Sequence, residues 1–379
     1  MSGPRRIGLN LLFLVPGETG GSEIYVRHLI PRLAEVRPDL ELVAFVNREG
    51  GGAELGVVEV VEVGVSGRSR ARRVLAEQRR LPRLARRHGI ELLHSPGTSA
   101  PRRPGVVSVV TILDVIYARF PEAHTLPMRL GMRVIVPVAA RGADRVITIS
   151  NAAAGDIADV LAVPRERIDV TYLGGRPTGP ATPEIELRRR LGLGEAPLVL
   201  SVSARRPHKN LPRLIEAFAN VTAEPPPLLV LPGYETPFED ELRRRAEELE
   251  VAERIRFLGW VSDEDLEGLY AAASCFAFPS LAEGFGLPVL EAMQRGVPVA
   301  CSAAGPLPEI GGDAVRYFDP VDVEGMARAL SDLLVNQCLR AELAKAGRER
   351  ARSFTWERTA RETVESYERA WAGSARSSE

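Results

Sequence analysis

The sequence predicts an α/β fold built from two doubly wound, Rossmann-like domains that face each other across a cleft. Three observations support this prediction. The chain has 379 residues, more than one hydrophobic core usually serves, so two domains are expected. Short apolar runs alternate with helical patterns in each half, which is typical of parallel sheets covered by helices. A segment rich in Pro and Gly, Gly174–Pro183, separates the halves and is typical of a hinge.

Composition excludes several classes of protein. Hydrophobic residues make up 45% of the chain, charged residues 26%, and the formal net charge is −1. The chain is therefore expected to be globular and gives no electrostatic case for binding nucleic acid. No apolar run approaches the roughly 18 residues that span a bilayer, so a cytoplasmic protein is expected. Cys275, Cys301 and Cys338 lack metal-ligand spacing and are expected as reduced core residues.

The first half opens with a strand, a glycine turn and a helix. Gly20 and Gly21 lie in that turn, where ligands bind in doubly wound sheets. They predict either a backbone surface that substrate approaches closely or a turn that only requires positive φ angles. His94 and the pair Leu113–Asp114 end two further strands, also at the edge where chemistry collects. The strands predicted here are 7–15, 40–46, 56–65, 90–94, 106–112, 145–150 and 168–173; the helices are 24–33 and 128–143, with a helix start at Ser150.

The segment Arg68–Arg87 holds nine arginines and one acid, Glu77. An apolar stripe can form on it from Val74, Leu75, Leu81 and Leu84. Pro82 is expected to kink or divide the helix. Two interpretations remain open. One is a basic amphipathic surface that contacts anionic lipid at the inner face of a membrane, or an anionic acceptor. The other is a solvated helix face.

The second half repeats the strand and helix alternation. Its fourth strand leads into Pro279–Glu291, a glycine-rich turn that carries Glu283 and Glu291 and opens a helix. Such a turn suits phosphate, because a helix N-terminus presents unpaired N–H groups and partial positive charge. The strands predicted are 197–202, 228–231, 255–258, 275–278, 297–301 and 315–318; the helices are 211–220, 238–249, 263–273, 289–295, 323–335, 340–352 and 356–371.

Carboxylates and basic residues gather around the same predicted sheet edge. Carboxylates accept paired hydrogen bonds from vicinal diols, so Glu283 and Glu291 indicate sugar or ribose. Lys209, with Arg205 or Arg206 beside it, lies in the turn after the first strand. Lysine with arginine is a common pairing for a diphosphate, although the turn taken alone is better explained as a solvated basic loop. Together these turns predict a site for a nucleotide-activated sugar.

Several motifs give the chain a family resemblance. Their residues are Gly20–Gly21, Val146–Ser150, Arg206–Leu211, Phe257–Ser262, Glu283–Glu291 and Phe354–Glu357. With them the chain resembles the retaining two-domain glycosyltransferases of the GT-B type, in the group 1 family numbered four. It is also similar, more weakly, to bacterial mannosyltransferases of O-antigen and exopolysaccharide assembly. The resemblance implies transfer of a hexose, expected to be mannose from GDP-mannose, to a saccharide or lipid-linked hydroxyl. It implies no cofactor and no metal, and the sequence has no D-x-D cluster.

The resemblance also implies roles for particular residues. Lys209 and Arg205 are expected to neutralise the donor diphosphate, and Glu283 to contact the transferred hexose. Glu291 is expected to bind the ribose, and the base to lie near Val261. The remaining expected donor contacts are the backbone of Gly286, Leu287 and Pro288. Attack from the front face, with the leaving phosphate taking the acceptor proton, is expected, and no covalent nucleophile is assigned.

One position departs from the family pattern. Relatives often carry His-Asp where this chain has Leu113–Asp114. The missing imidazole implies a different sugar, a lower rate, or compensation by His94 or His124. Asp114 is expected either to orient a hydroxyl of the donor or acceptor, or to cap a helix.

The expected domains are an acceptor-binding domain at 1–175, a donor-binding domain at 176–355, and a last helix, 356–379, that crosses back to the first domain. Two alternatives to a transferase remain: a sugar-nucleotide epimerase of the same fold and a non-catalytic sugar-nucleotide binder. A nicotinamide dehydrogenase is disfavoured because the first turn lacks G-x-G-x-x-G.

Overall fold

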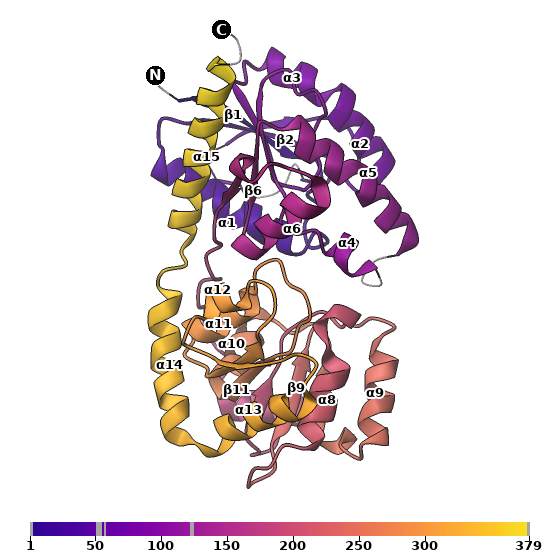
Figure 1. Ribbon diagram of the computed structural model, residues 1–379, viewed down its shortest axis with the longest axis vertical. Helices are drawn as coiled ribbons and strands as arrows, with labels where there is room; N and C mark the ends of the chain where they lie inside the picture. The colour runs from indigo at the N-terminus through magenta and orange to yellow at the C-terminus, as the bar shows by residue number, and fades with distance from the viewer. Residues whose placement is uncertain (1–2, 51–54, 57, 122–124, 377–379) are drawn as a thin grey trace. The chain divides into compact units, whose positions relative to one another are not determined.

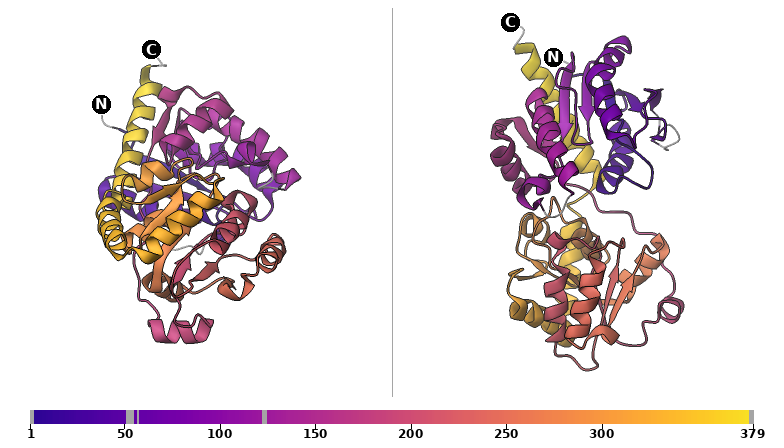
Figure 2. Two further views of the ribbon diagram at one scale, coloured as in Figure 1. Left: turned by 60° about the horizontal axis from the view of Figure 1, so that its bottom comes forward. Right: turned by 90° about the vertical axis from the view of Figure 1, so that its right-hand side faces the viewer.

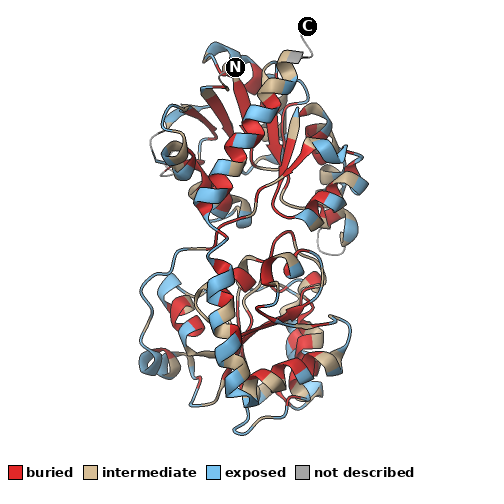
Figure 3. Cartoon of the chain, turned by 60° about the vertical axis from the view of Figure 1, so that its left-hand side comes forward, coloured by how far each residue is buried: buried red, intermediate tan, exposed pale blue. Residues whose placement is uncertain are grey.

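The computed structural model describes residues 3–50, 55–56, 58–121 and 125–376. The chain divides into two compact units. Unit 1 comprises Met1–Gly174 with Thr355–Glu379, and unit 2 comprises Gly175–Phe354. In each unit a parallel sheet lies between helices (Figure 1, Figure 2). Figure 3 shows that the strands of both sheets are mostly buried, while the helices expose one face.

The sheet of unit 1 contains seven strands among the described residues, in the order β3-β2-β1-β4-β5-β6-β7. All neighbouring strands run parallel, with Ile7 of β1 opposite Leu42 on one side and Leu92 on the other. Successive strands are added to one side of β1 as far as β3 and then to the other side from β4 onwards. The switch point therefore lies between β1 and β4, and ligands bind beside the loops that follow such strands. The strands are β1 (Arg6–Leu11), β2 (Glu41–Val46), β3 (Glu59–Glu62), β4 (Leu92–Ser95), β5 (Val107–Thr111), β6 (Arg145–Thr148) and β7 (Ile168–Val170).

The last helix of the chain, α15, packs on the first helix of unit 1. The Trp356 ring stacks on His28 with 5.0 Å between ring centroids, and the Thr359 hydroxyl donates to the Tyr172 carbonyl over 2.6 Å. The helices of unit 1 are α1 (Gly21–Val36), α2 (Arg70–Arg79), α3 (Leu81–Arg87), α4 (Ile116–Arg119), α5 (Leu126–Gly142), α6 (Asn151–Leu161), η3 (Arg165–Arg167) and α15 (Trp356–Arg376).

The arginine-rich segment forms two helices that meet near Pro82, so of the two predicted effects, a kink or a division, the division is found. Helix α2 ends at Arg79, and α3 begins at Leu81 with Pro82 in its first turn. Proline is accepted there because the first-turn N–H groups have no partner within the helix. The predicted strand 56–65 is shorter, Glu59–Glu62, and mostly exposed, since β3 is an edge strand.

Unit 2 has six strands among its residues, in the order β10-β9-β8-β11-β12-β13, and all pairs are parallel. The order in which strands are added to the sheet switches sides between β8 and β11. The loops after these two neighbouring strands therefore lie side by side at one edge of the sheet. The strands are β8 (Leu198–Leu200), β9 (Leu228–Pro232), β10 (Ile255–Leu258), β11 (Ala273–Phe278), β12 (Val299–Ser302) and β13 (Arg316–Phe318).

Several features of unit 2 differ from prediction, among them the short helix at Leu307–Gly311, which was not predicted. Helix α7 follows the hinge segment and was not predicted, because Leu187 is its only buried residue and leaves almost no apolar pattern. Cys338 is exposed on α14, so its expected core position is wrong; Cys275 and Cys301 are buried as predicted. The helices are α7 (Glu184–Leu191), η4 (Pro207–Lys209), α8 (Leu211–Ala219), α9 (Glu239–Glu248), η5 (Ala252–Arg254), α10 (Asp263–Ala272), α11 (Leu287–Gln294), α12 (Leu307–Gly311), α13 (Val323–Val335) and α14 (Gln337–Ala351).

Candidate functional site

Lys209 and Glu283 meet at the ligand-binding edge of unit 2. Lys209 follows β8 and Glu283 follows β11, and these strands are paired neighbours. The Lys209 Nζ atom lies 2.6 Å from Glu283 Oε1, with side-chain exposures of 16% and 10%. The same Nζ atom lies 5.5 Å from the centre of the Phe278 ring. The Lys209 ammonium and the Glu283 carboxylate thus form a partly buried ion pair, and both side chains remain partly accessible to solvent.

Hydrogen bonds to main-chain atoms fix the two loops that carry this pair. The Asn210 side-chain amide donates to the carbonyls of Pro279 (3.0 Å) and Pro320 (2.7 Å). The Leu281 N–H donates to the His208 carbonyl over 2.8 Å. Asn210 is buried and adopts a positive φ of 59°, a conformation that asparagine tolerates better than most residues. Sequence reasoning missed this role, although Asn210 directly follows Lys209 in a quoted motif.

The turn before α11 requires glycine at position 286. Gly286 has a φ of 104°, and a Cβ there would lie 2.6 Å from Leu307 Cδ2. Helix α11 begins at Leu287 with Pro288 in its first turn, and both residues are half-buried. The Gly286 carbonyl accepts from Val289 and Leu290 N–H. The helix N-terminus therefore starts at the same loop that carries Glu283.

Glu291 has different surroundings from Glu283. It lies on α11 and is 8% exposed. Tyr270 donates its hydroxyl to Glu291 Oε2 over 3.2 Å, and Arg176 Nε lies 3.5 Å from Oε1. Burial raises the pKa of Glu291, and the charges of Arg176 and Arg295 oppose that rise. The two glutamates of the motif are thus separated in environment: Glu283 contacts Lys209, and Glu291 contacts Tyr270 and Arg176.

Arg205 does not share the contacts of Lys209. Only 1% of the residue is exposed, and its Nη1 atom lies 2.6 Å from Glu239 Oε2. Its Nη2 group donates to the Leu231 carbonyl over 2.9 Å and also to the Leu258 carbonyl. Burial lowers the pKa of Arg205, and the charge of Glu239 opposes this. Since Leu231 and Leu258 lie in β9 and β10, the guanidinium joins the ends of both strands, whereas the sequence prediction directed it towards a diphosphate.

The loops near Arg205 expose two aromatic rings. Tyr234 and Trp260 are 52% and 71% exposed and stack with 4.7 Å between centroids at 33°. The Thr236 hydroxyl donates to the Arg205 carbonyl over 2.6 Å, so Arg205 also holds the loop that follows Tyr234. Val261, the predicted neighbour of the base, follows Trp260 and is half-buried. Sequence reasoning missed Tyr234, because one tyrosine in a turn carries no pattern.

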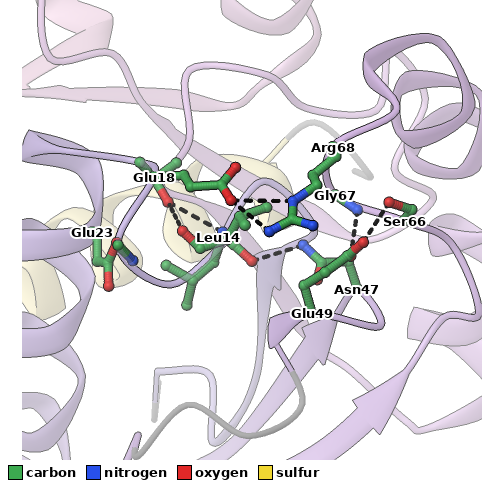
Figure 4. A network of polar contacts seen from close by, with 11 residues as sticks. Leu14, Glu18, Glu23, Asn47, Glu49, Ser66, Gly67 and Arg68 are labelled. Atoms are coloured by element: carbon green, nitrogen blue, oxygen red, sulfur yellow. Dashed lines mark hydrogen bonds and ion pairs between the residues drawn. The ribbon is translucent and has the colours of Figure 1, made fainter.

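The glycine turn of unit 1 is held by polar contacts (Figure 4). The Gly17 N–H donates to Glu23 over 2.9 Å, and Arg68 pairs with Glu18 at 2.6 Å. Gly20 has a φ of 58° and lies directly before α1. A Cβ added to Gly20 or Gly21 would meet no atom within 4 Å. The backbone at the start of α1 is therefore accessible. The turn combines the two predicted properties, a positive φ at Gly20 and an open backbone surface.

Asn47 and Glu49 fix the chain behind that turn. The Asn47 amide donates to the carbonyls of Leu12 and Leu14, each over 2.8 Å. Glu49 accepts from the Ser66 hydroxyl and the Gly67 N–H (Figure 4). The hydrogen bond from the Ser66 hydroxyl is the main reason that the pKa of Glu49 is lowered.

His94 is sealed in the core of unit 1. It is 0% exposed; its Nδ1 atom lies 2.7 Å from the Tyr367 hydroxyl and its Nε2 atom 2.8 Å from Thr111 Oγ1. Burial lowers the pKa of His94 to about 3, so the ring is neutral at physiological pH. Its contacts join α15 to β4 and β5. His124 lies outside the described residues.

Asp114 accepts a main-chain hydrogen bond just before a short helix. Its Oδ1 atom accepts from the Ile116 N–H over 3.0 Å, at the start of α4. The N-cap residue of α4 is Val115 and no side chain caps that position, so the predicted capping role of Asp114 is not confirmed; Asp114 is half-buried. Leu113, at the position of the absent histidine, is also half-buried.

Among the helices of the described residues, none combines the length and apolarity needed to span a bilayer. Within the same residues, no three or more His, Cys, Asp or Glu side chains are grouped so that they could hold a metal ion.

Comparisons with known proteins agree with this architecture. The family described as Glycosyltransferase Family 4 matches residues 19–174, and the family described as Glycosyl transferases group 1 matches residues 184–350. O-antigen chain mannosyltransferase B of Escherichia coli is 32% identical over 282 residues, covering 73% of this chain and 74% of that protein. MMP alpha-(1->4)-mannosyltransferase of Mycolicibacterium hassiacum is 33% identical over 237 residues, covering 62% of this chain and 56% of that protein.

Solved structures share the fold at lower identity. Sucrose-phosphate synthase from Thermosynechococcus elongatus superposes with a TM-score of 0.77 at 22% identity, covering 97% of this chain and 100% of that chain. HepE from Anabaena, solved in complex with UDP and glucose, gives a TM-score of 0.73 at 22% identity, covering 95% and 98%. These likenesses confirm the predicted GT-B fold class with its two Rossmann-like domains. With two family models matching successive parts of the chain, this protein belongs to the group 1 glycosyltransferases, family 4.

Proposed function

We propose that the protein transfers mannose from GDP-mannose to a hydroxyl of a saccharide or lipid-linked acceptor, with retention of anomeric configuration. The observation that carries the proposal is the Lys209–Glu283 pair, 2.6 Å apart at the edge where β8 and β11 end. It supplies one positive charge for a diphosphate and one carboxylate for a sugar. Mannose is favoured because the two relatives described above are named mannosyltransferases.

Lys209 has two partners in this proposal. Without donor its ammonium contacts Glu283; with donor it also neutralises the diphosphate, which lowers the cost of charge building on the leaving group. Glu283 then accepts hydrogen bonds from hexose hydroxyls and stabilises positive charge on the sugar. The bond from the anomeric carbon to the phosphate oxygen breaks, and the bond to the acceptor oxygen forms on the same face. The departing phosphate takes the acceptor proton.

The rest of the donor lies along unit 2 in this proposal. The N-terminus of α11, at Gly286, Leu287 and Pro288, faces phosphate with its partial positive charge. Glu291 receives the ribose hydroxyls, which compete with Arg176 for Oε1, a contact that is long at 3.5 Å. The base lies beside Val261. Arg205 supports these loops from behind rather than contacting phosphate, because it is buried, its Nη1 atom pairs with Glu239 and its Nη2 group donates to two carbonyls.

Unit 1 is proposed to bind the acceptor. Gly20 and Gly21 offer an open backbone surface, and the half-buried Asp114, which follows β5, is proposed to orient a hydroxyl of the acceptor. His94 is proposed to shape this unit only through its neutral hydrogen bonds. We further propose that no metal ion is required, since Lys209 and the α11 N-terminus meet the diphosphate charge. Addition of EDTA is then expected to leave the rate unchanged. The cytoplasmic location stays a prediction.

The proposal is tested by measuring mannose transfer from GDP-mannose to saccharide acceptors by mass spectrometry. Lys209→Met and Glu283→Gln are each expected to lower the rate about 100-fold or more, the loss seen when one charge-stabilising group is removed. Lys345→Met and Glu253→Gln, at exposed positions of unit 2, are the matched controls and should keep full activity. Unchanged rates in both site variants would sink the assignment, and an inverted product anomer in the proton NMR spectrum would refute retention.

One observation favours a second candidate, a non-catalytic sugar-nucleotide binder. Leu113 stands where relatives often carry histidine. Tight GDP-mannose binding without turnover across acceptors would support the binder, and activity gained by Leu113→His would identify the missing group. Conversion of the donor sugar when no acceptor is present would instead indicate an epimerase.

A further inference from the structure

Helix α5 exposes an apolar stripe that the fold leaves uncovered. Leu126, Leu130 and Val134 are 57%, 53% and 65% exposed. They recur every four residues and so lie on one face of the helix. Val136, Ala139 and Ala140 are the buried residues of α5. Single exposed apolar residues are ordinary, but a periodic stripe on a helix is a feature that needs a partner.

Arginines flank this stripe. Within Leu126–Gly142 the charged residues are Arg129, Arg133 and Arg141, and the sequence of the helix contains no acid. Arg133 and Arg141 are exposed. No ion pair joins either of them to a carboxylate of the described chain. The helix thus combines an apolar face with uncompensated positive charge, the composition of helices that lie in a membrane interface.

Helix α2 lies beside α5 and extends the basic surface. Arg70 Nη2 is 3.9 Å from Met128 Sδ, and Figure 1 shows the two helices next to each other on unit 1. Leu75 is 51% exposed on α2. The exposed arginines of α2 and α3 that form no ion pair with a described carboxylate are Arg70, Arg72, Arg79, Arg83, Arg86 and Arg87.

The one acid of α2 does not offset this charge. Glu77 is 0% exposed and accepts from the Ser99 hydroxyl over 3.0 Å. Burial raises the pKa of Glu77, which favours its neutral form, and the charge of Arg73 opposes this. The outer surface of α2, α3 and α5 is therefore strongly positive, although the whole chain has a net charge of −1.

Charge decides which partner fits. A second copy docked through the same face would bring two arginine-rich surfaces together, which is unfavourable. A bilayer with anionic lipids offers headgroups to the arginines and an apolar interior to the α5 stripe, and each basic residue near such a surface adds to binding. We propose that α2, α3 and α5 form a membrane-docking surface on which Leu126, Leu130 and Val134 enter the interface of an anionic bilayer.

Vesicle sedimentation with the full chain tests this surface without any donor sugar, so its outcome is separate from glycosyl transfer. The protein should bind vesicles that contain about one-third phosphatidylglycerol and bind phosphatidylcholine vesicles at least tenfold more weakly. Arg72→Gln, Arg79→Gln and Arg83→Gln combined should weaken binding about 100-fold. Leu126→Gln, Leu130→Gln and Val134→Gln combined should weaken it about tenfold or more, also at high salt, where charge is screened.

The control is Ile185→Gln with Val335→Gln, two exposed apolar residues of unit 2 at 86% and 64% exposure, and it should bind as the unmodified chain does. Circular dichroism shows whether each variant remains folded. Equal binding to neutral and anionic vesicles, or an α5 variant that binds like the control, would overturn the proposal. So would a dimer in gel filtration that the α5 substitutions abolish, because the stripe would then belong to a second copy of the chain.

Discussion

Arg205 gives the sharpest test of how unit 2 is built. The substitution Arg205→Met removes the guanidinium and keeps an apolar stem of similar width. It removes the Arg205 partner of Glu239 Oε2, at 2.6 Å, from a side chain that is 12% exposed, while Arg243 stays paired with Glu239 Oε1. It also leaves the Leu231 and Leu258 carbonyls without this donor.

Removing one member of a buried ion pair costs about 3–5 kcal/mol, because the remaining charge stays desolvated. Because Arg243 still pairs with Glu239, the lower end of this range applies, and at about 1.4 kcal/mol per factor of ten the opening equilibrium of β9 and β10 should rise about 100-fold. Hydrogen exchange of peptides that span β9 and β10, followed by mass spectrometry, measures this directly. A local measurement is preferable because a chain of two units need not unfold in one step.

Two controls separate the ion pair from general damage. Arg206→Met changes an exposed neighbour and should alter stability by less than about 0.5 kcal/mol. Adding Glu239→Leu to Arg205→Met removes the carboxylate that has lost its Arg205 partner and should restore part of the lost protection. If Arg205→Met leaves exchange unchanged and instead weakens GDP binding, the residue contacts phosphate and the structural reasoning is refuted.

Three further results are expected. Between pH 6.5 and about 3 the unfolded chain binds a proton at His94 that the folded chain does not bind, because the folded-state pKa is lowered to about 3. The free energy of unfolding should therefore decrease as the pH is lowered, by up to about 1.4 kcal/mol per pH unit. His94→Gln should remove this slope in urea titrations. Gly286→Ala places a Cβ 2.6 Å from Leu307 Cδ2 and should cost about 1–3 kcal/mol of unfolding free energy and weaken GDP binding, whereas Gly179→Ala, with open space around it, should do neither. Truncation after Thr355 removes α15 and its Trp356 and Tyr367 contacts, so circular dichroism should show a largely unfolded unit 1.

Each of these results has a contrary outcome. An unchanged pH slope in His94→Gln would mean that other groups cause it. A Gly286→Ala variant as stable as Gly179→Ala would show that the turn relaxes around the new methyl group. A folded, cooperative truncation would show that α15 is dispensable for the core of unit 1.

The order of strands and helices was predictable because buried parallel strands are short apolar runs separated by glycine turns. Lys209 and Glu283 could be brought together from sequence, since both follow strands of one sheet. Arg205 could not, because a sequence shows that an arginine is near a turn but not whether its side chain points to solvent or inward. Asp114 stayed undecided for the same reason: a carboxylate after a strand serves equally as a ligand or as a cap.

Other misses came from missing patterns. Helix α7 buries only Leu187, so it shows no apolar periodicity. Cys338 was placed in the core by residue type, but the surface of α14 accepts a cysteine without a partner. The α5 stripe was hidden because an exposed Leu126 or Leu130 looks in sequence like any core residue of an amphipathic helix.

Calorimetric titration with GDP and with GMP tests most directly whether the Lys209–Glu283 site holds a nucleoside diphosphate. Lys209→Met should weaken GDP binding about tenfold to 100-fold, since a hydrogen bond to a charged group contributes about 1.5–3 kcal/mol. GMP, which lacks the second phosphate, should be affected much less, and Lys345→Met should bind both nucleotides as the unmodified chain does. Equal GDP affinity in Lys209→Met and the unmodified chain would contradict the proposed site.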